Sequence, residues 1–411
     1  MKRIKLTNRK ENGSVYFLTL ASAVVLIGLV LGLSVHNLQF RRSSRSQTQI
    51  DRAYIYAELG IRHALHFTKV EPNWRQVLNN GTWLEDIAVD QAIYTVTGID
   101  PVDGDLANNR DDPVVLTATA TINGVNRTIS VKTQPAPLKI LHYAVAAVND
   151  INISSHVRIN GDVTSNANID KSGSDTWIFG NAEAVGTVHE TTNISGDISP
   201  GSNPKDFPNA GEIMTYYKSR ATIIPYIATI EKVLLSPSSN PFGPTNPDGL
   251  YYIDCGIGKI TIKNCRIIGT LIIRSILVDK INIESAINWR PARPDYPVLI
   301  VDYNLSRIHI KTDKDLDEDD IKADLSLPGE PGYGDEVDIY PNIIKGLIYC
   351  YNDILLENKC NIQGTVIARD DIVIKDDAVC TYDPTILDNP PKGFHNSALV
   401  PVHGTWRRLI P

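Results

Sequence analysis

The chain has 411 residues, a formal net charge of −7 and an aromatic content of 7%. This length suffices for two or three domains beyond a terminal segment. The mild acidity argues against binding to nucleic acid, so no nucleic-acid partner is expected. The five cysteines form no CxxC pair, which argues against a zinc ribbon.

A charge-free apolar run from Ser14 to Phe40 follows a short basic leader at residues 1–13. The run is long enough to cross the ~30 Å hydrocarbon core of a bilayer as a helix. Both flanks are basic, but the leader is shorter and carries more charge, so we expect the N-terminus in the cytoplasm and the remaining chain exported. A cleaved secretory signal fits less well, because its apolar core spans only ~7–15 residues.

Helical spacing continues beyond the apolar run. Between Gln47 and Phe67, apolar residues recur at steps of three and four positions, with charged residues such as Asp51 and Arg62 between them. Pro72 stops the pattern. The sequence therefore predicts one transmembrane and amphipathic helix over residues 14–69, which can lie in a bilayer and also pack against other helices.

The junction between leader and helix resembles the N-terminus of type IV pilin-like proteins. The residues that carry the resemblance are Glu11-Asn12-Gly13 and then Ser14-Val15-Tyr16-Phe17-Leu18. It implies cleavage by a prepilin peptidase after Gly13, which would leave Ser14 as the mature N-terminus. Major pilins keep a glutamate where this chain has Leu18, and minor subunits of the PilX and K-type pseudopilin sort share that departure. A plain single-pass anchor is the alternative.

The resemblance also implies a location and partners. The chain would be a single-pass protein of the bacterial inner membrane with an exported periplasmic or cell-surface part. Its N-terminal helix would contact other pilin-like subunits and the membrane.

Residues 70–137 are predicted to form a small β-rich module. Two β-branched runs begin at Gln91 and Pro113, and Asn123-Gly124 provides a hairpin turn into a third. Three antiparallel strands packed on the amphipathic helix would form a pilin-like head.

The loop between the first two of these runs is rich in oxygen ligands. Calcium takes six to eight oxygens, often from a flexible loop with a glycine. The candidate ligands are Asp103, Asp105, Asn108, Asp111 and Asp112. The loop lacks EF-hand spacing, and a solvated turn is the alternative. No other cofactor is expected. The acidic run from Asp313 to Asp320 is interpreted as an exposed insertion.

An internal repeat begins at about residue 138. Each copy has a glycine with aliphatic residues two positions before, two after and eight after. Five glycines match this pattern: Gly161, Gly186, Gly269, Gly346 and Gly364. A truncated copy surrounds Gly196. About one match is expected by chance if roughly a third of residues are aliphatic. The last two copies are 18 residues apart and contain short strands, which suits one turn of a parallel β-solenoid. A β-sandwich is the alternative.

The expected organisation is mainly β. The solenoid is predicted in two parts, residues 138–208 and 250–411. A helical and loop insertion at residues 209–249 separates them, and loop insertions interrupt the second part at residues 288–297 and 305–339. Alternation predicts that Ile348, Ile354 and Val366 point inward.

The cysteines lie within the predicted solenoid. In an exported compartment, Cys255–Cys265 or Cys350–Cys360 could form disulfides, whereas Cys380 completes an odd count. Buried free thiols are the alternative.

An enzymatic solenoid would need carboxylates on adjacent turns. Asp370 and Asp371 form such a pair, and the repeat places Asp353 one turn away. Acidic residues also fill solenoid turns for structural reasons, and the sequence contains no phosphate loop, nucleophile elbow or histidine-rich metal cluster. We therefore expect a non-enzymatic assembly protein of a type IV pilus or a type II secretion-like system. The alternative is an anchored β-helix protein that binds or degrades cell-surface polysaccharide.

Overall fold

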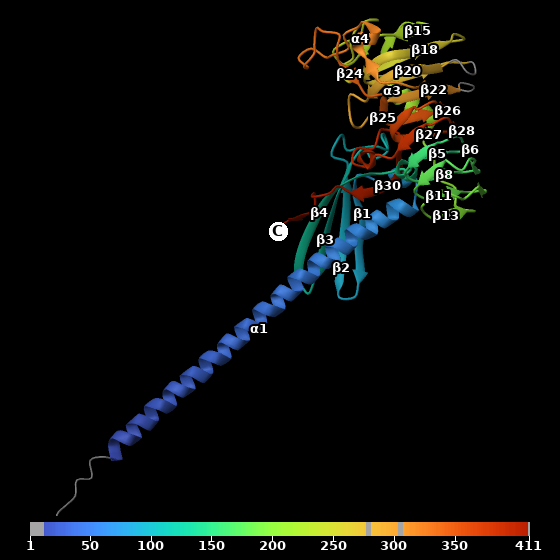
Figure 1. Cartoon of the computed structure of the whole chain (residues 1–411). Coiled ribbons are helices and arrows are strands. Elements are labelled where there is room, and N and C mark those ends of the chain that lie inside the picture. Colours follow the sequence, from blue (N-terminus) through green and yellow to red (C-terminus); the bar gives the residue numbers. More distant parts are fainter. Residues whose placement is uncertain (1–11, 277–280, 303–306, 410–411) are drawn as a thin grey trace, which may run out of the picture. The chain divides into compact units, whose positions relative to one another are not determined.

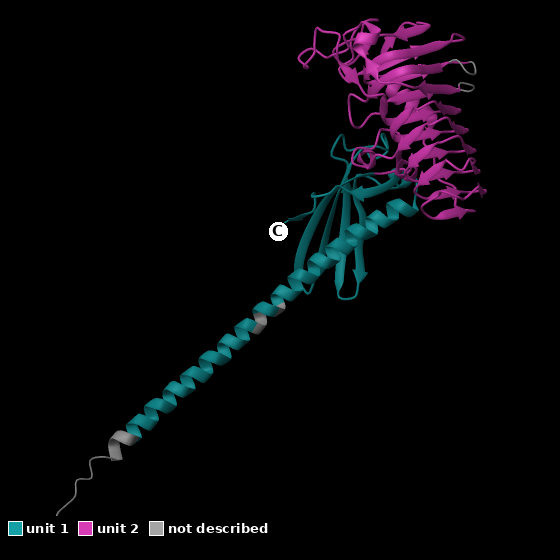
Figure 2. Ribbon diagram, in the orientation of Figure 1, with its two compact units in different colours: residues 1–135, 397–411 teal, residues 136–396 magenta. Residues whose placement is uncertain are grey.

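The computed structural model describes residues 12–276, 281–302 and 307–409. It divides into two compact units (Figure 2): unit 1 comprises residues 1–135 and 397–411, and unit 2 comprises residues 136–396. The fold is mainly β, as expected, with one long N-terminal helix, an antiparallel sheet and a large parallel β-solenoid (Figure 1).

Helix α1 (Asn12–Val70) is continuous, and its two halves differ in burial. In the second half, Ala53, Ala57, Ile61 and Ala64 are buried at steps of four, four and three residues. Gly60 lies on the same face, where a Cβ atom would come within 2.9 Å of the Tyr94 ring. The helix can therefore approach the sheet this closely because glycine stands at this position.

Unit 1 is built on an antiparallel sheet with the strand order β1-β2-β3-β4-β30, and β31 also pairs with β4. The strands are β1 (Gly81–Val89), β2 (Ala92–Ile99), β3 (Val114–Ile122), β4 (Val125–Pro137), β30 (His395–Pro401) and β31 (Arg407–Leu409). A short helix, α2 (Trp74–Val77), precedes β1. Burial alternates along the whole of β3, because every second side chain faces α1 and the core.

The C-terminal residues belong to this sheet, which corrects the expectation that the solenoid extends to residue 411. The indole Nε1 of Trp74 donates to the carbonyl oxygen of Ser397 at 2.6 Å. The N–H of Leu399 donates to Oγ1 of Thr68 at 3.2 Å. The solenoid is thus inserted in the sequence between β4 and β30. The repeat could not show this boundary, because pairing between strands so distant in sequence leaves no local pattern.

Unit 2 is a solenoid of short parallel strands. The first are β5 (Val145–Ala147), β6 (Ile151–Ile153), β7 (Arg158–Asn160), β8 (Val163–Ser165), β9 (Ile169–Lys171), β10 (Trp177–Phe179), β11 (Ala182–Ala184), β12 (Val188–His189) and β13 (Ile198–Pro200). The next are β14 (Thr222–Ile224), β15 (Thr229–Glu231), β16 (Leu234–Leu235), β17 (Leu250–Asp254), β18 (Ile260–Ile268), β19 (Thr270–Arg274), β20 (Ile281–Arg290), β21 (Leu299–Asp302) and β22 (Ile308–Thr312). The last are β25 (Ile343–Cys350), β26 (Ile354–Glu357), β27 (Asn361–Ala368), β28 (Ile372–Ile374) and β29 (Val379–Thr381).

The remaining elements of unit 2 connect or decorate the coils. They are η1 (Lys139–His142), α3 (Ala210–Lys218), η2 (Pro384–Leu387), and the small antiparallel pair β23 (Leu316–Asp317) and β24 (Ile339–Tyr340) with α4 (Glu318–Ile321).

The coils do not stack in sequence order. The coil containing β27, β28 and β29 pairs in parallel with β5, β6 and β7, so the end of the solenoid rests on its beginning. From there the early strands continue through β8 and β11 to β13. On the other side the coils run back through β25 and β20 to β14–β16. The chain crosses between the two ends of the stack at residues 201–221.

Helix α3 lies in this crossing segment. Its Ile213 and Tyr217 are fully buried and pack on outward side chains of the solenoid, among them Ile272, Ile300 and Ile367. The strands beneath α3 are therefore buried on both faces, by the solenoid core on the inside and by the helix on the outside. This explains why Leu299-Ile300-Val301 is uninterrupted by polar residues.

The structure also differs from the insertions expected from sequence. A helix is present at the start of residues 209–249, but β14, β15 and β16 form the first coil where helical spacing was expected to continue. Strand β20 reaches Arg290, inside the expected loop 288–297, and β22 lies inside the expected loop 305–339. The apolar residues in these segments fit helical spacing as well as strand alternation. Parallel pairing with the next coil decides in favour of strands.

The inward register is confirmed for the three predicted residues. Val366 pairs with Ile348 on one side and Val145 on the other, and Ile354 pairs with Ile372; all five are fully buried. At the corner of the coil, Gly364 has a φ of 149° and lies so close to the preceding coil that a Cβ atom would be 2.0 Å from the carbonyl oxygen of Gly346. The repeat glycine is thus required by both conformation and space.

We expect Val366→Asp to destabilise unit 2 by several kcal/mol, because it buries an unpaired carboxylate in an apolar core. Val373→Asp is the matched control, since Val373 lies on the outward side of β28 and is only partly buried. Urea unfolding of the detergent-solubilised chain, followed by circular dichroism, measures both. Equal effects of the two substitutions would contradict the assigned register.

Candidate functional sites

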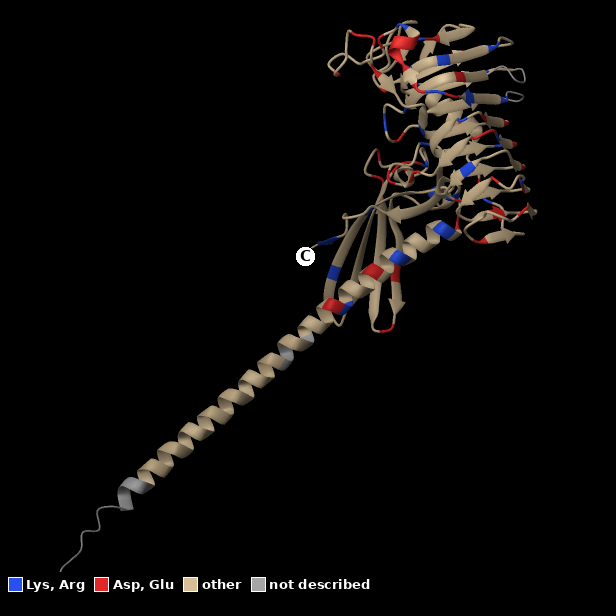
Figure 3. Ribbon diagram, in the orientation of Figure 1, with Lys and Arg blue, Asp and Glu red and all other residues tan. Residues whose placement is uncertain are grey.

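The first half of α1 presents an apolar surface that nothing in the described chain covers. Every described side chain from Tyr16 to Phe40 is exposed, and this segment is long and apolar enough to cross a membrane. Figure 3 shows no acidic or basic residue along it. Such a surface is stable in lipid or against other apolar helices.

The expected processing position lies at the start of this helix. Gly13 and Ser14 are in the first turn of α1, whereas Glu11 lies outside the described residues. The backbone fits a continuous helix after the leader, and cleavage there stays a prediction.

The second half of α1 borders a groove in unit 1 of about 600 Å³. Ile55 projects from the helix and is 63% exposed, and Trp406, just before β31, is 41% exposed. Arg62 pairs with Glu58 at 2.7 Å, and the Arg408 guanidinium lies 4.5 Å from the Tyr54 ring centroid. The groove therefore combines exposed apolar side chains with charges of both signs, which suits contact with another amphipathic helix.

An exposed aromatic pair marks one face of the solenoid. The Trp177 and Phe179 rings stack with centroids 5.5 Å apart and planes 8° from parallel, and both are about two-fifths exposed. The Arg158 guanidinium lies 4.6 Å from the Phe179 ring centroid. Asn160, which pairs with Phe179 in the sheet, donates to Thr381 Oγ1 at 3.0 Å. This surface was not predicted, although the alternating Trp-Ile-Phe run offered a signal.

The carboxylates expected of an enzyme belong to a hydrogen-bonded ladder. Oδ1 of Asp353 accepts the N–H of Asp371 at 3.3 Å, and Oδ1 of Asp371 accepts the N–H of Asp150 at 3.0 Å. The ladder continues from Asp150 to Asn168 and from Asn168 to Thr187, each at 3.0 Å. Each side chain thus satisfies a backbone donor of the next coil at the same corner.

Asp370 lies beside this ladder. One oxygen each of Asp353, Asp370 and Asp371 falls within 4.8 Å of the others, so the structure does bring the three together. Asp370 accepts a hydrogen bond from the Asn149 side chain, and Asp353 pairs with Arg307 at 3.2 Å. The carboxylates therefore all have structural partners.

Ionisation of Asp371 is unfavourable in the folded chain. Burial raises its pKa, the N–H of Asp150 opposes the increase, and the neighbouring carboxylates of Asp370, Asp353 and Asp150 add to it. Because the folded pKa lies above the unfolded value, this group's stabilising contribution is complete below the unfolded pKa and is lost as pH rises through the folded pKa.

Asp371→Asn should therefore increase the free energy of unfolding slightly near pH 7, and the difference should shrink as the pH is lowered towards the ordinary carboxyl range near about pH 4, because the raised pKa favours the protonated carboxyl in the folded chain. Asp371→Ala should be less stable than Asp371→Asn by about 1 kcal/mol, since it leaves the N–H of Asp150 without an acceptor. Thermal unfolding at the two pH values measures both effects. A loss of stability in the Asn variant at pH 7 would contradict this role.

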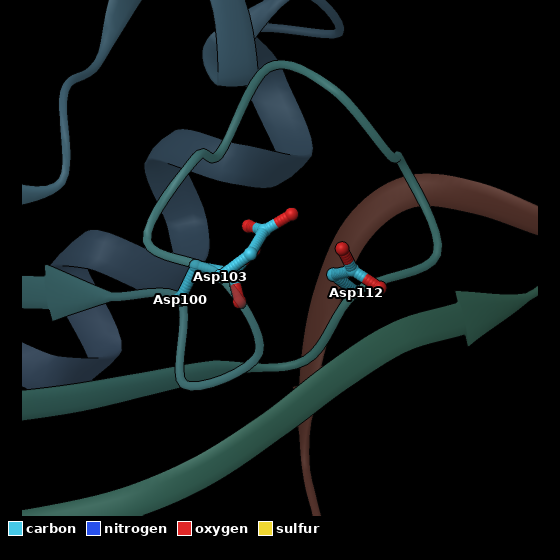
Figure 4. A group of neighbouring side chains, drawn as sticks. All are labelled: Asp100, Asp103 and Asp112. Carbon is cyan, nitrogen blue, oxygen red and sulfur yellow. The ribbon is translucent and has the colours of Figure 1, made fainter.

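The acidic loop of unit 1 brings together only part of the expected calcium ligands. Oxygens of Asp103 and Asp112 lie within 4.8 Å of one another and of Asp100, which was not predicted (Figure 4). Asp105 accepts the N–H of Ala107, and Asn108 donates to Asp103. Asp111 is outside the group. The hydrogen bonds from Asp105 and then Asn108 hold the pKa of Asp103 below its usual range.

All five cysteines are buried free thiols, which is the alternative considered from the sequence, and neither of the two possible disulfides is present. Burial raises the pKa of Cys255, Cys265, Cys350 and Cys380 to about 12. These thiols fill the apolar core and are unreactive as thiolates at neutral pH.

No family model and no characterised protein matches this sequence. Among solved structures, the competence-associated pilin ComZ from Thermus thermophilus aligns over 88% of this chain and 97% of its own, at 11% identity and a TM-score of 0.31. An ice-binding protein from an Antarctic biological consortium covers 61% of this chain and 91% of its own, at 10% identity and a TM-score of 0.30. A Shewanella frigidimarina ice-binding protein covers 60% and 98%, at 12% identity and a TM-score of 0.28. Likenesses this weak carry no inference about ligand or activity.

Proposed function

We propose that this chain is a non-enzymatic, membrane-anchored, pilin-like subunit, related to PilX-type minor subunits, of a type IV pilus or a type II secretion-like assembly. It would reside in the bacterial inner membrane with the solenoid exported to the periplasm or cell surface. The observation that carries the proposal is α1 itself: this helix is apolar and exposed on all sides from Tyr16 to Phe40, and its second half packs against an antiparallel sheet.

Three features support an assembly role. A bare apolar helix needs lipid or similar helices around it. The groove at Ile55 and Trp406 continues that contact surface into the amphipathic half. The solenoid is inserted as a loop between β4 and β30, so it is attached to the sheet by both ends of its chain.

The anchor can be tested by co-expression with a prepilin peptidase. We expect loss of residues 1–13 and a mature N-terminus at Ser14, measured by intact mass and N-terminal sequencing. Gly13→Leu should retain the leader, because the peptidase would meet a bulky residue at the cut. Gly32→Leu is the control: a Cβ atom there meets nothing within 4 Å, and processing should be normal. Retention of Met1 in the wild type, or a cut beyond Phe40, would leave a plain anchor or a secreted protein.

A second proposed role is binding of a surface polysaccharide at Trp177 and Phe179. Exposed aromatic faces bordered by hydrogen-bonding groups suit a sugar ring, which has an apolar C–H face and polar edges. Arg158 and Asn160 supply such groups beside the pair.

Replacing both aromatic residues by alanine should weaken binding to immobilised bacterial polysaccharide at least tenfold, measured by surface plasmon resonance on the detergent-solubilised chain. Tyr333→Ala removes an aromatic ring that is 58% exposed elsewhere on unit 2 and should leave binding unchanged. Equal binding by all three proteins would place the ligand surface elsewhere, and release of sugar fragments by the wild type would contradict the non-enzymatic assignment.

A further inference from the structure

The loop between β2 and β3 gathers three carboxylates at its base. Asp100 directly follows β2, Asp112 lies shortly before β3, and Asp103 reaches back from the loop (Figure 4). One oxygen from each lies within 4.8 Å of the other two. Like charges this close repel one another unless a cation lies among them.

Asp100 supplies an independent sign of a missing ligand. Its side chain is only 3% exposed, and Oδ2 is buried without a hydrogen-bond partner. The other oxygen, Oδ1, accepts the N–H of Val102 at 2.7 Å. A buried carboxylate oxygen that has lost water and gained no donor is costly. One oxygen of the same Asp100 carboxylate lies within 4.8 Å of oxygens of the two carboxylates that complete the group.

One buried guanidinium, that of Arg75, lies beside this group. It donates to the backbone carbonyls of Leu106, at 3.2 Å, and of Asp112. Burial lowers the pKa of Arg75, and the nearby carboxylates of Asp100, Asp112 and Asp111 oppose that change.

Arg110 and Asp111, also near Arg75, add one charge of each sign. Three carboxylates gathered beside one guanidinium form an acidic group that suits a divalent cation.

We propose that Asp100, Asp103 and Asp112 bind a calcium ion that closes the β2–β3 loop. Two oxygens that ligate one Ca²⁺ lie at most about 5 Å apart, because each Ca–O distance is 2.3–2.6 Å. The three carboxylate oxygens, all within 4.8 Å of one another, fit this span. Mg²⁺ demands near-ideal octahedral geometry and usually keeps several of its waters, so a group of three protein carboxylates suits it less well. Water and loop carbonyls would complete the coordination.

The site can be tested on the full chain in detergent after removal of metal with a chelating resin. Calcium chloride is titrated by isothermal calorimetry up to about 10 mM, which covers the weaker extracellular calcium modules. Hydrogen exchange read out over residues 100–112 then locates the effect. We expect saturable binding and slower exchange in that loop, and weaker effects with magnesium chloride.

Asp100→Asn should reduce affinity at least tenfold and abolish the protection of the loop. Asp112→Asn gives a second variant if Asp100→Asn proves unfolded by circular dichroism. Asp370→Asn is the matched control, since it alters the acidic group of the solenoid, whose members have partners. Absence of saturable binding, or protection of residues 100–112 that survives in both Asp100→Asn and Asp112→Asn, would overturn the proposal. The outcome is independent of whether the chain enters a pilus.

Discussion

Unit 2 depends on one set of contacts, the parallel pairing of β27, β28 and β29 with β5, β6 and β7. A solenoid coil has an apolar interior and unpaired backbone groups on both of its open sides, so each coil needs a neighbour. Here the last coil and the first strands pair with each other, so each provides the neighbour that the other requires. The first and last strands of unit 2 are therefore neighbours, and this allows the whole solenoid to be inserted in the sequence of unit 1 between β4 and β30.

This arrangement has a consequence for the crossing segment. The chain must pass from β13 at one end of the stack to β14 at the other, and residues 201–221 do so along the outside. Helix α3 uses that path to cover one face with Ile213 and Tyr217. The same crossing that connects the ends therefore buries a second apolar layer, and the strands beneath it lose their polar alternation.

In unit 1, close packing of α1 and the added C-terminal strands complete the sheet. Gly60 allows α1 to approach Tyr94 and Val96 closely, and the C-terminal strands add to the sheet beyond β4. Two features of unit 1 lack a partner within the described residues. The apolar half of α1 has no cover within the described chain, and Asp100 has a buried oxygen without a donor. A partner outside the chain can stabilise each of them. Lipid or another helix can cover the apolar surface of α1, and a cation can bind the carboxylate oxygen of Asp100.

The sequence by itself determined the features that have a local period. Apolar length predicted the helix, glycine spacing predicted the solenoid, and strand alternation predicted its inward residues, because helical and strand periodicities are patterns of neighbouring positions. It identified Asp103 and Asp112 by their chemistry but not Asp100, whose burial becomes visible only in the folded chain. Only the tertiary structure decided which coil stacks on which, that β14–β16 are strands, and that residues 397–409 return to unit 1. Those choices rest on pairings between residues far apart in sequence, where an isoleucine fits many coils equally well and only the assembled stack selects one.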